Sequence, residues 1–168
     1  LIARIVDAKG NIRSEAAPVA AGAGSERAID PRNAWLMNSL LKDVVRAGTA
    51  TRALSLGRAD LAGKTGTTNE NVDAWFCGYN AAVVGVAWIG FDQPKKLGAN
   101  ETGGLAALPI WMNYMGRVLK GIPEAQQTVP EGVISVRIDP ETGLRAGDGK
   151  LAAEIIANVF VRAKGVKS

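Results

Sequence analysis

Apolar residues recur at helical spacing in two segments of the 168-residue chain. Pro31 suits the first turn of a helix, and Gly48 can end one. The second segment is stopped by Gly121. The pattern therefore predicts helices at about 31–47 and 108–120, each with one apolar face. The residues expected on these faces are Trp35, Met37, Leu40, Leu41, Val44 and Val45 in the first helix, and Ile110, Trp111, Tyr114, Met115, Val118 and Leu119 in the second.

Between the two helices, three closely spaced segments have the short apolar pattern of strands, at about 61–68, 72–80 and 82–91. Asn80 and Ala81 mark a tight connection, which predicts that the last two strands are antiparallel. The third segment is apolar throughout and is expected to lie centrally in the sheet. A further strand is predicted at "GVISVRID". These elements indicate an α+β fold with a mainly antiparallel sheet packed by helices.

The two ends of the chain are less clearly patterned than its middle. Residues 1–13 are predicted to form a hairpin that turns at Ala8-Lys9-Gly10-Asn11. Residues 14–25 are small and rich in alanine and glycine, which is typical of an exposed loop or linker. The apolar tail at 151–163 fits either a helix or a strand.

Composition narrows the possible chemistry. No run of about 18 apolar residues is present, so no segment of this sequence is predicted to span a membrane. The net charge of +4 is spread along the chain without the clustered basic face of nucleic-acid binders. The sequence contains no histidine and a single cysteine, Cys77, which excludes histidine-dependent triads and an internal disulfide. Cys77, Trp75, Phe76 and Trp88 are all expected in the core.

The segment "DLAGKTGTTNENVDAWFCGY" contains a motif that can be interpreted in two ways. Gly63-Lys64-Thr65 matches the end of a phosphate-binding P-loop. The nearest upstream glycine is Gly57, which leaves five residues before Gly63 where that motif needs four. The residues after Thr65 form a poor helix start, and no apolar strand precedes Gly57. Spacing, entry and exit all disfavour the P-loop.

Lys64-Thr65-Gly66 instead matches the K-T-G motif of serine acyltransferases that recognise penicillin. An extended substrate can pair with the backbone of an edge strand, and glycine lets it approach closely. The Lys64 ammonium would face a substrate carboxylate or a serine hydroxyl. Thr65 and Thr67 offer hydroxyl donors, and the Thr67 N–H can face a developing oxyanion.

The surrounding sequence makes a resemblance specific. "LAGKTGTTNENVDAWFCGY", "VVGVAWIGFDQPKKLG" and "ETGGLAALPIWMNYM" resemble the C-terminal part of the transpeptidase domain of bifunctional, class A penicillin-binding proteins. The resemblance runs from about Asp30 to Met115, and residues 1–25 are poorly matched. It implies that 1–146 are the C-terminal portion of an incomplete transpeptidase fold and 147–168 an extension. It also implies that Lys64 and the Thr67 N–H are catalytic, and that the substrate-binding residues are Thr65, Gly66, Thr67 and Thr68.

In this family the serine of an upstream S-x-x-K motif attacks a D-alanyl-D-alanine stem peptide. The amine of a neighbouring peptide then resolves the acyl-enzyme, and β-lactams acylate the same serine. Here Ser39-Leu40-Leu41-Lys42 is an S-x-x-K match, but only 21 residues separate Lys42 from Lys64, with no S-x-N motif among them. Ser39 is therefore expected to be an ordinary helix residue. The chain is predicted to contain no nucleophile and to be inactive alone.

The resemblance also implies a location and partners. The parent protein would be anchored in the bacterial inner membrane, would face the periplasm and would have an upstream glycosyltransferase domain. Expected partners are stem peptides, β-lactams and the N-terminal half of the parent. No metal, organic cofactor or nucleic acid is implied, and unpaired surfaces could allow self-association. The alternative is a stand-alone, non-catalytic module that keeps the substrate-binding wall.

Overall fold

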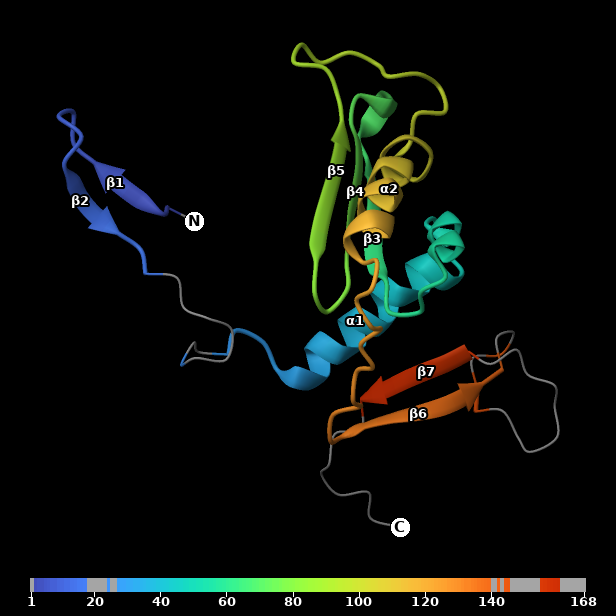
Figure 1. Cartoon of the computed structure of the whole chain (residues 1–168). Coiled ribbons are helices and arrows are strands. Elements are labelled where there is room, and N and C mark those ends of the chain that lie inside the picture. The colour runs from blue at the N-terminus through green and yellow to red at the C-terminus, as the bar shows by residue number, and fades with distance from the viewer. Residues whose placement is uncertain are drawn as a thin grey trace. The chain divides into compact units, whose positions relative to one another are not determined.

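The computed structural model describes residues 2–17, 24, 27–139, 142 and 144–145, together with the backbone of 155–160. Two compact units make up the chain, Leu1–Asp30 and Pro31–Ser168. Figure 1 shows their elements in chain order.

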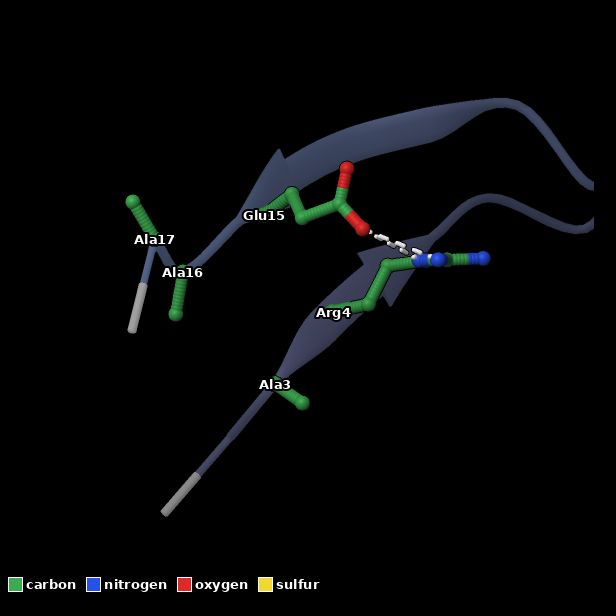
Figure 2. Close-up of a pocket in the computed structure, with 5 residues that line it drawn as sticks. All are labelled: Ala3, Arg4, Glu15, Ala16 and Ala17. Atoms are coloured by element: carbon green, nitrogen blue, oxygen red, sulfur yellow. Dashed lines mark hydrogen bonds and ion pairs between the residues drawn. The ribbon is translucent and has the colours of Figure 1, made fainter. Parts of the chain in front are cut away.

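The first unit contains an antiparallel hairpin of β1 (Arg4–Val6) and β2 (Ile12–Glu15). Arg4 lies opposite Glu15, and its Nε and Nη2 donate to Glu15 Oε1 at 3.1 and 2.9 Å. Figure 2 shows this pair beside Ala3, Ala16 and Ala17, with which it lines a shallow hollow. The predicted hairpin is confirmed. The loop expected from residue 14 begins later, because Ser14 and Glu15 belong to β2.

A single carboxylate organises the hairpin turn. Asp7 Oδ1 accepts hydrogen bonds from the backbone N–H groups of Lys9 and Asn11, both at 2.9 Å. Asp7 Oδ2 accepts from Asn11 Nδ2 at 3.0 Å and pairs with Arg13 at 3.0 Å. The hydrogen bonds from Asn11 hold the pKa of Asp7 below its ordinary value. Aspartate at the start of this turn therefore explains why the chain reverses there.

The second unit is built on three antiparallel strands in the order β3 (Ala62–Thr67), β4 (Ala74–Tyr79) and β5 (Val84–Ile89). All three strands were predicted within two residues of these bounds. The expectation that the third strand lies centrally is wrong, because β4 is central and β5 pairs only with β4 in the described part of the chain. Its continuous apolar run reflects exposed side chains rather than a second strand neighbour.

One face of this sheet is covered by α2 (Leu108–Val118) and by the π-helical turn η3 (Gly103–Ala107) that leads into it. Trp111 packs edge-on against Phe76 with ring centroids 4.9 Å apart, and its Nε1 donates to Gly78 O at 3.2 Å. The buried apolar core around this contact includes Val45, Leu61, Ala74, Phe76, Ala87, Ala107, Leu108, Trp111, Met115 and Leu119.

Among the described residues, the opposite face of the sheet is open around Trp75 and Trp88, while Tyr79 on the same face contacts Asn38 of the first helix. Trp75 is 39% exposed, Trp88 45% and Val86 59%, and the thiol of Cys77 is also exposed. The predictions of a core position for Trp75, Trp88 and Cys77 are therefore wrong, while that for Phe76 is confirmed. Strand alternation explains the split, since Trp75 and Cys77 point to one face and Phe76 to the other. Trp88 donates from Nε1 to Asp73 Oδ1 at 2.9 Å.

Helix α1 (Pro31–Arg46) packs against β3 and is followed by the short 3-10 helix η1 (Thr51–Leu56). Its predicted position is confirmed within one residue. Of its expected apolar face, Val45 is buried, whereas Met37 and Leu40 are exposed. A second short 3-10 helix, η2 (Asn69–Asn71), joins β3 to β4.

The C-terminal strands β6 (Val133–Ile138) and β7 (Ile155–Phe160) pair antiparallel. The first was predicted, and the second decides the ambiguous tail in favour of a strand. The rest of 151–163 lies outside the described residues. The predicted α+β class with antiparallel sheets is confirmed. None of the helices described is long and apolar enough to cross a membrane.

Candidate functional site

The predicted motif lies on β3, which has β4 on one side and no strand on the other in the described part of the chain. Side chains alternate along it, so Lys64 and Gly66 face the open side of the sheet with Cys77 and Trp75. Thr65 and Thr67 face the side covered by η3 and α2. The edge position that the motif needs is therefore present.

The ammonium group of Lys64 is exposed beside its own strand. Its Nζ donates to the backbone carbonyl of Thr65 at 3.1 Å and lies 3.5 Å from Thr65 Oγ1. No carboxylate forms an ion pair with Lys64 among the described residues. A positive charge without a fixed counter-ion at a strand edge can attract an anionic ligand.

Thr65 has a partner that sequence analysis did not identify. Its Oγ1 lies 2.9 Å from Oγ1 of Thr49, in the turn after α1. The residues are 16 positions apart and belong to different elements, so no local pattern joins them.

Thr67 and Gly66 are held by η3. Thr67 Oγ1 accepts a hydrogen bond from Gly103 N at 3.0 Å. A Cβ on Gly103 would lie 2.3 Å from Trp75 O and 2.6 Å from Gly66 O, so only glycine fits against the paired strands here. Glycine at 103 thereby fixes how closely η3 approaches β3. This contact also escaped sequence analysis, because a Gly-Gly pair in a polar loop predicts only flexibility.

Thr68, predicted to bind substrate, organises the turn between β3 and β4. Its Oγ1 accepts from Asp73 N at 2.7 Å, and its N–H donates to Asp73 O at 3.1 Å. The Thr68 hydroxyl is exposed and has one proton to donate. Asp73 O lies 3.5 Å from Thr68 Oγ1 and can accept that proton.

A buried ion pair fixes the entry to β3. Arg58 Nε and Nη2 donate to the two oxygens of Asp60 at 2.8 and 2.7 Å, and Arg58 Nη1 donates to Ile122 O at 2.8 Å. Asn80 Nδ2 donates to Asp60 Oδ2 at 3.1 Å. Burial on its own would raise the pKa of Asp60, but the hydrogen bonds from Arg58 and Asn80 outweigh it and lower that pKa. The pair ties the segment after α2 to the strand that holds Lys64.

Ser39 and Lys42 lie on α1 and not on β3. Lys42 lines a hollow of about 190 Å³ together with Asn38, Asp60 and Tyr79. Tyr79 donates from its hydroxyl to Asn38 Oδ1 at 3.0 Å, and burial raises the pKa of Tyr79. Ser39 is only half-buried and sits in the middle of the helix, consistent with the prediction of an ordinary helix residue.

Comparison with known proteins identifies the family. The model of the penicillin binding protein transpeptidase domain matches residues 4–115. The chain belongs to this family. The match ends where the predicted resemblance ends, at Met115. It begins at residue 4, so the expectation that 1–25 are poorly matched is wrong, and the hairpin is part of the family sequence.

Individual relatives agree with this assignment. Penicillin-binding protein 1A of Pseudomonas aeruginosa is 54% identical over 74% of this chain, and that of Neisseria lactamica is 49% identical over 80%. The crystal structure of penicillin-binding protein 1A from Haemophilus influenzae aligns with a TM-score of 0.70 and 29% identity over 93% of this chain. The chain spans only 15% and 17% of the two sequence relatives and 28% of the crystallised chain.

Proposed function

We propose that this chain is one part of a serine D,D-transpeptidase that cross-links peptidoglycan stem peptides and binds penicillins through an acyl-enzyme. The observation that supports this most directly is the K-T-G-T sequence on an edge strand, within a family match over residues 4–115. The parent protein would act at the periplasmic face of the inner membrane, anchored by a segment outside this chain.

In this proposal, Lys64 to Thr68 form one wall of the substrate site. The exposed Lys64 ammonium attracts the substrate carboxylate or a serine hydroxyl of the missing part. Gly66 lets an extended peptide approach the strand edge, and the Thr67 N–H faces the developing oxyanion. Thr65 and Thr68 supply hydroxyl groups along the same strand end. The contacts of Thr67 with Gly103 and of Thr68 with Asp73 keep that end rigid, as a preorganised site requires.

The chain alone would be inactive, because it lacks a positioned nucleophile. An active serine needs an adjacent base and an oxyanion site within hydrogen-bond reach. Ser39 is the only serine of this sequence that begins S-x-x-K, and it lies within α1. The nucleophile and its base would come from the N-terminal half of the parent domain.

The open sheet face also supports the proposal that another part of the domain supplies the nucleophile. Trp75, Val86 and Trp88 expose large apolar side chains on the face that also presents Lys64. An exposed apolar patch of this kind marks a surface that another protein segment covers. We assign that cover to the missing half of the domain, which would bring its serine to the side of Lys64.

The test is acylation by benzylpenicillin followed by intact-mass measurement. The chain alone should show no adduct, while full-length penicillin-binding protein 1A of Pseudomonas aeruginosa should show one as the positive control. Co-expression with the segment encoded upstream should restore the adduct on a serine of that segment. An adduct on Ser39 would refute the proposed inactivity. A start codon directly before Leu1 would favour the stand-alone binding module and remove the enzymatic role.

A further inference from the structure

Three groups from two elements meet at the outer side of β3. Lys64 and Thr65 belong to the strand, and Thr49 belongs to the turn between α1 and η1. Thr65 Oγ1 lies 2.9 Å from Thr49 Oγ1 and 3.5 Å from Lys64 Nζ. Lys64 and Thr49 are exposed and Thr65 is half-buried, so solvent and ligands reach this group.

Hydrogen-bond accounting leaves one hydroxyl proton of this group unused. An ammonium group only donates, so Lys64 donates toward Thr65 O and Oγ1. Each hydroxyl has one proton, and the contact between the two threonines uses one of the two. The remaining proton belongs to Thr49 if Thr65 donates, and to Thr65 if Thr49 donates. In either case the pair and the ammonium can together offer donors to one anion.

Thr49 is held in place from a second side. A Cβ on Gly104 would lie 2.9 Å from Thr49 O and 3.7 Å from Thr65 Cγ2. The backbone of η3 therefore packs directly on the Thr49 turn and on the Thr65 side chain. This packing restrains the Thr49 backbone and the Thr65 side chain next to their hydroxyls.

We propose that the hydrogen-bonded hydroxyls of Thr49 and Thr65, together with the Lys64 ammonium, form a preformed subsite for the carboxylate of the bound peptide. This inference rests on the proposed function for the identity of the ligand, a peptide ending in D-alanyl-D-alanine. It adds Thr49, which lies outside β3, to the proposed substrate-binding residues Lys64 to Thr68. Because all three groups belong to this chain, the subsite should bind a carboxylate without the missing half of the domain.

The test is an NMR titration of the isotope-labelled full chain with N-acetyl-D-alanyl-D-alanine, and with its C-terminal amide as the uncharged control. Thr49→Val removes the hydroxyl at nearly constant volume, and Thr49→Ser restores it. The acid should shift the amides of Thr49 and of Lys64 to Thr67. Thr49→Val should weaken binding of the acid by about tenfold, the usual effect of losing one hydrogen bond to a charged group.

Each result decides the matter. Thr49→Ser should bind the acid within about twofold of the unmodified chain, and the amide should bind the chain and Thr49→Val equally. Equal binding of the acid by Thr49→Val and the unmodified chain would refute the role of Thr49. Absence of shifts at both Thr49 and Lys64 would refute a preformed subsite. Neither result would affect the proposed function, which the acylation test decides separately.

Discussion

The Arg58 guanidinium donates hydrogen bonds to both oxygens of the Asp60 carboxylate, at 2.8 and 2.7 Å. Asp60 lies two residues before the start of β3, the strand that contains Lys64. The side chains are only 13% and 4% exposed. A buried pair of this kind is costly to break, because the remaining charge stays desolvated.

Arg58→Met should therefore lower the free energy of unfolding by about 3 kcal/mol. Chemical denaturation followed by tryptophan fluorescence measures this. The matched control is Asp43→Asn, which removes the ion pair with Arg46, where both side chains are 55% exposed. That change should cost less than about 0.5 kcal/mol. Equal losses in the two variants would show that burial does not set the strength of the Arg58–Asp60 pair.

The lowered pKa of Asp60 predicts a stability that depends on acid pH. The folded state holds this proton less tightly than the unfolded state, whose pKa is about 3.9. The stabilisation is therefore fully present above that value and is lost as the pH falls through the lower folded pKa. Denaturation curves between pH 6 and about pH 2 should show the loss in the unmodified chain. Asp60→Asn should lose less stability over the same range, and an identical slope in both proteins would contradict the assignment.

Gly103→Ala should disturb β3, the strand that contains Lys64 and Thr67. The added methyl would meet the carbonyl oxygens of Trp75 and Gly66 at 2.3 and 2.6 Å, and these are backbone atoms that cannot turn away. We expect a loss of at least about 2 kcal/mol and shifted amide resonances at Gly66 and Thr67. The control is Gly116→Ala in α2, whose methyl would meet only the flexible end of Leu56 at 3.2 Å. That variant should be neutral or stabilised by up to about 1 kcal/mol.

The open sheet face predicts self-association of the isolated chain. Strand β5 exposes Val86 and Trp88 on this face, and an exposed apolar patch favours association with another chain. Val86→Lys should shift the sedimentation profile toward monomer and leave the unfolding midpoint unchanged. Val129→Lys adds the same charge at another exposed valine and should not alter association. A profile that is monomeric before any substitution would exclude association through this face.

Cys77 offers a direct probe of that face. Its thiol is exposed, so in the Val86→Lys variant, which is expected to be monomeric, iodoacetamide should alkylate it under native conditions about as completely as in denaturant. Co-expression with the upstream segment should protect it, since the proposed cover lies over the same face. Protection of Cys77 in the monomeric Val86→Lys variant would contradict an exposed thiol.

Sequence patterns predicted the elements well, because their causes are local. Helix α1 begins at Pro31 as predicted, α2 ends at Val118, two residues before the end predicted from Gly121, and the turn at Asp7 explains the hairpin. The place of the K-T-G motif on an edge strand also followed from its sequence. Sequence patterns failed where the position of a strand in the sheet depends on which other strands pair with it. The run around Trp88 is apolar enough for a central strand, yet within this chain β5 has a neighbour on one side only.

The contacts around the site were beyond prediction for a related reason. Thr49 and Thr65 meet because α1 packs on β3, and neither residue has a neighbouring pattern that indicates the other. Gly103 packs closely against the backbones of Gly66 and Trp75, although its Gly-rich sequence predicts a flexible loop. These relationships depend on how separate elements dock, which a single sequence records only indirectly.

The π-helical turn at Gly103–Ala107 has a consequence for how this family can change in length. It leads without a break into α2, so removing one of its residues would rotate the helix that follows by about 100°. Trp111 and Met115 would then turn away from the sheet they now cover. Insertions and deletions among homologues should accordingly accumulate in the loop at 92–102 and stop abruptly at Gly103.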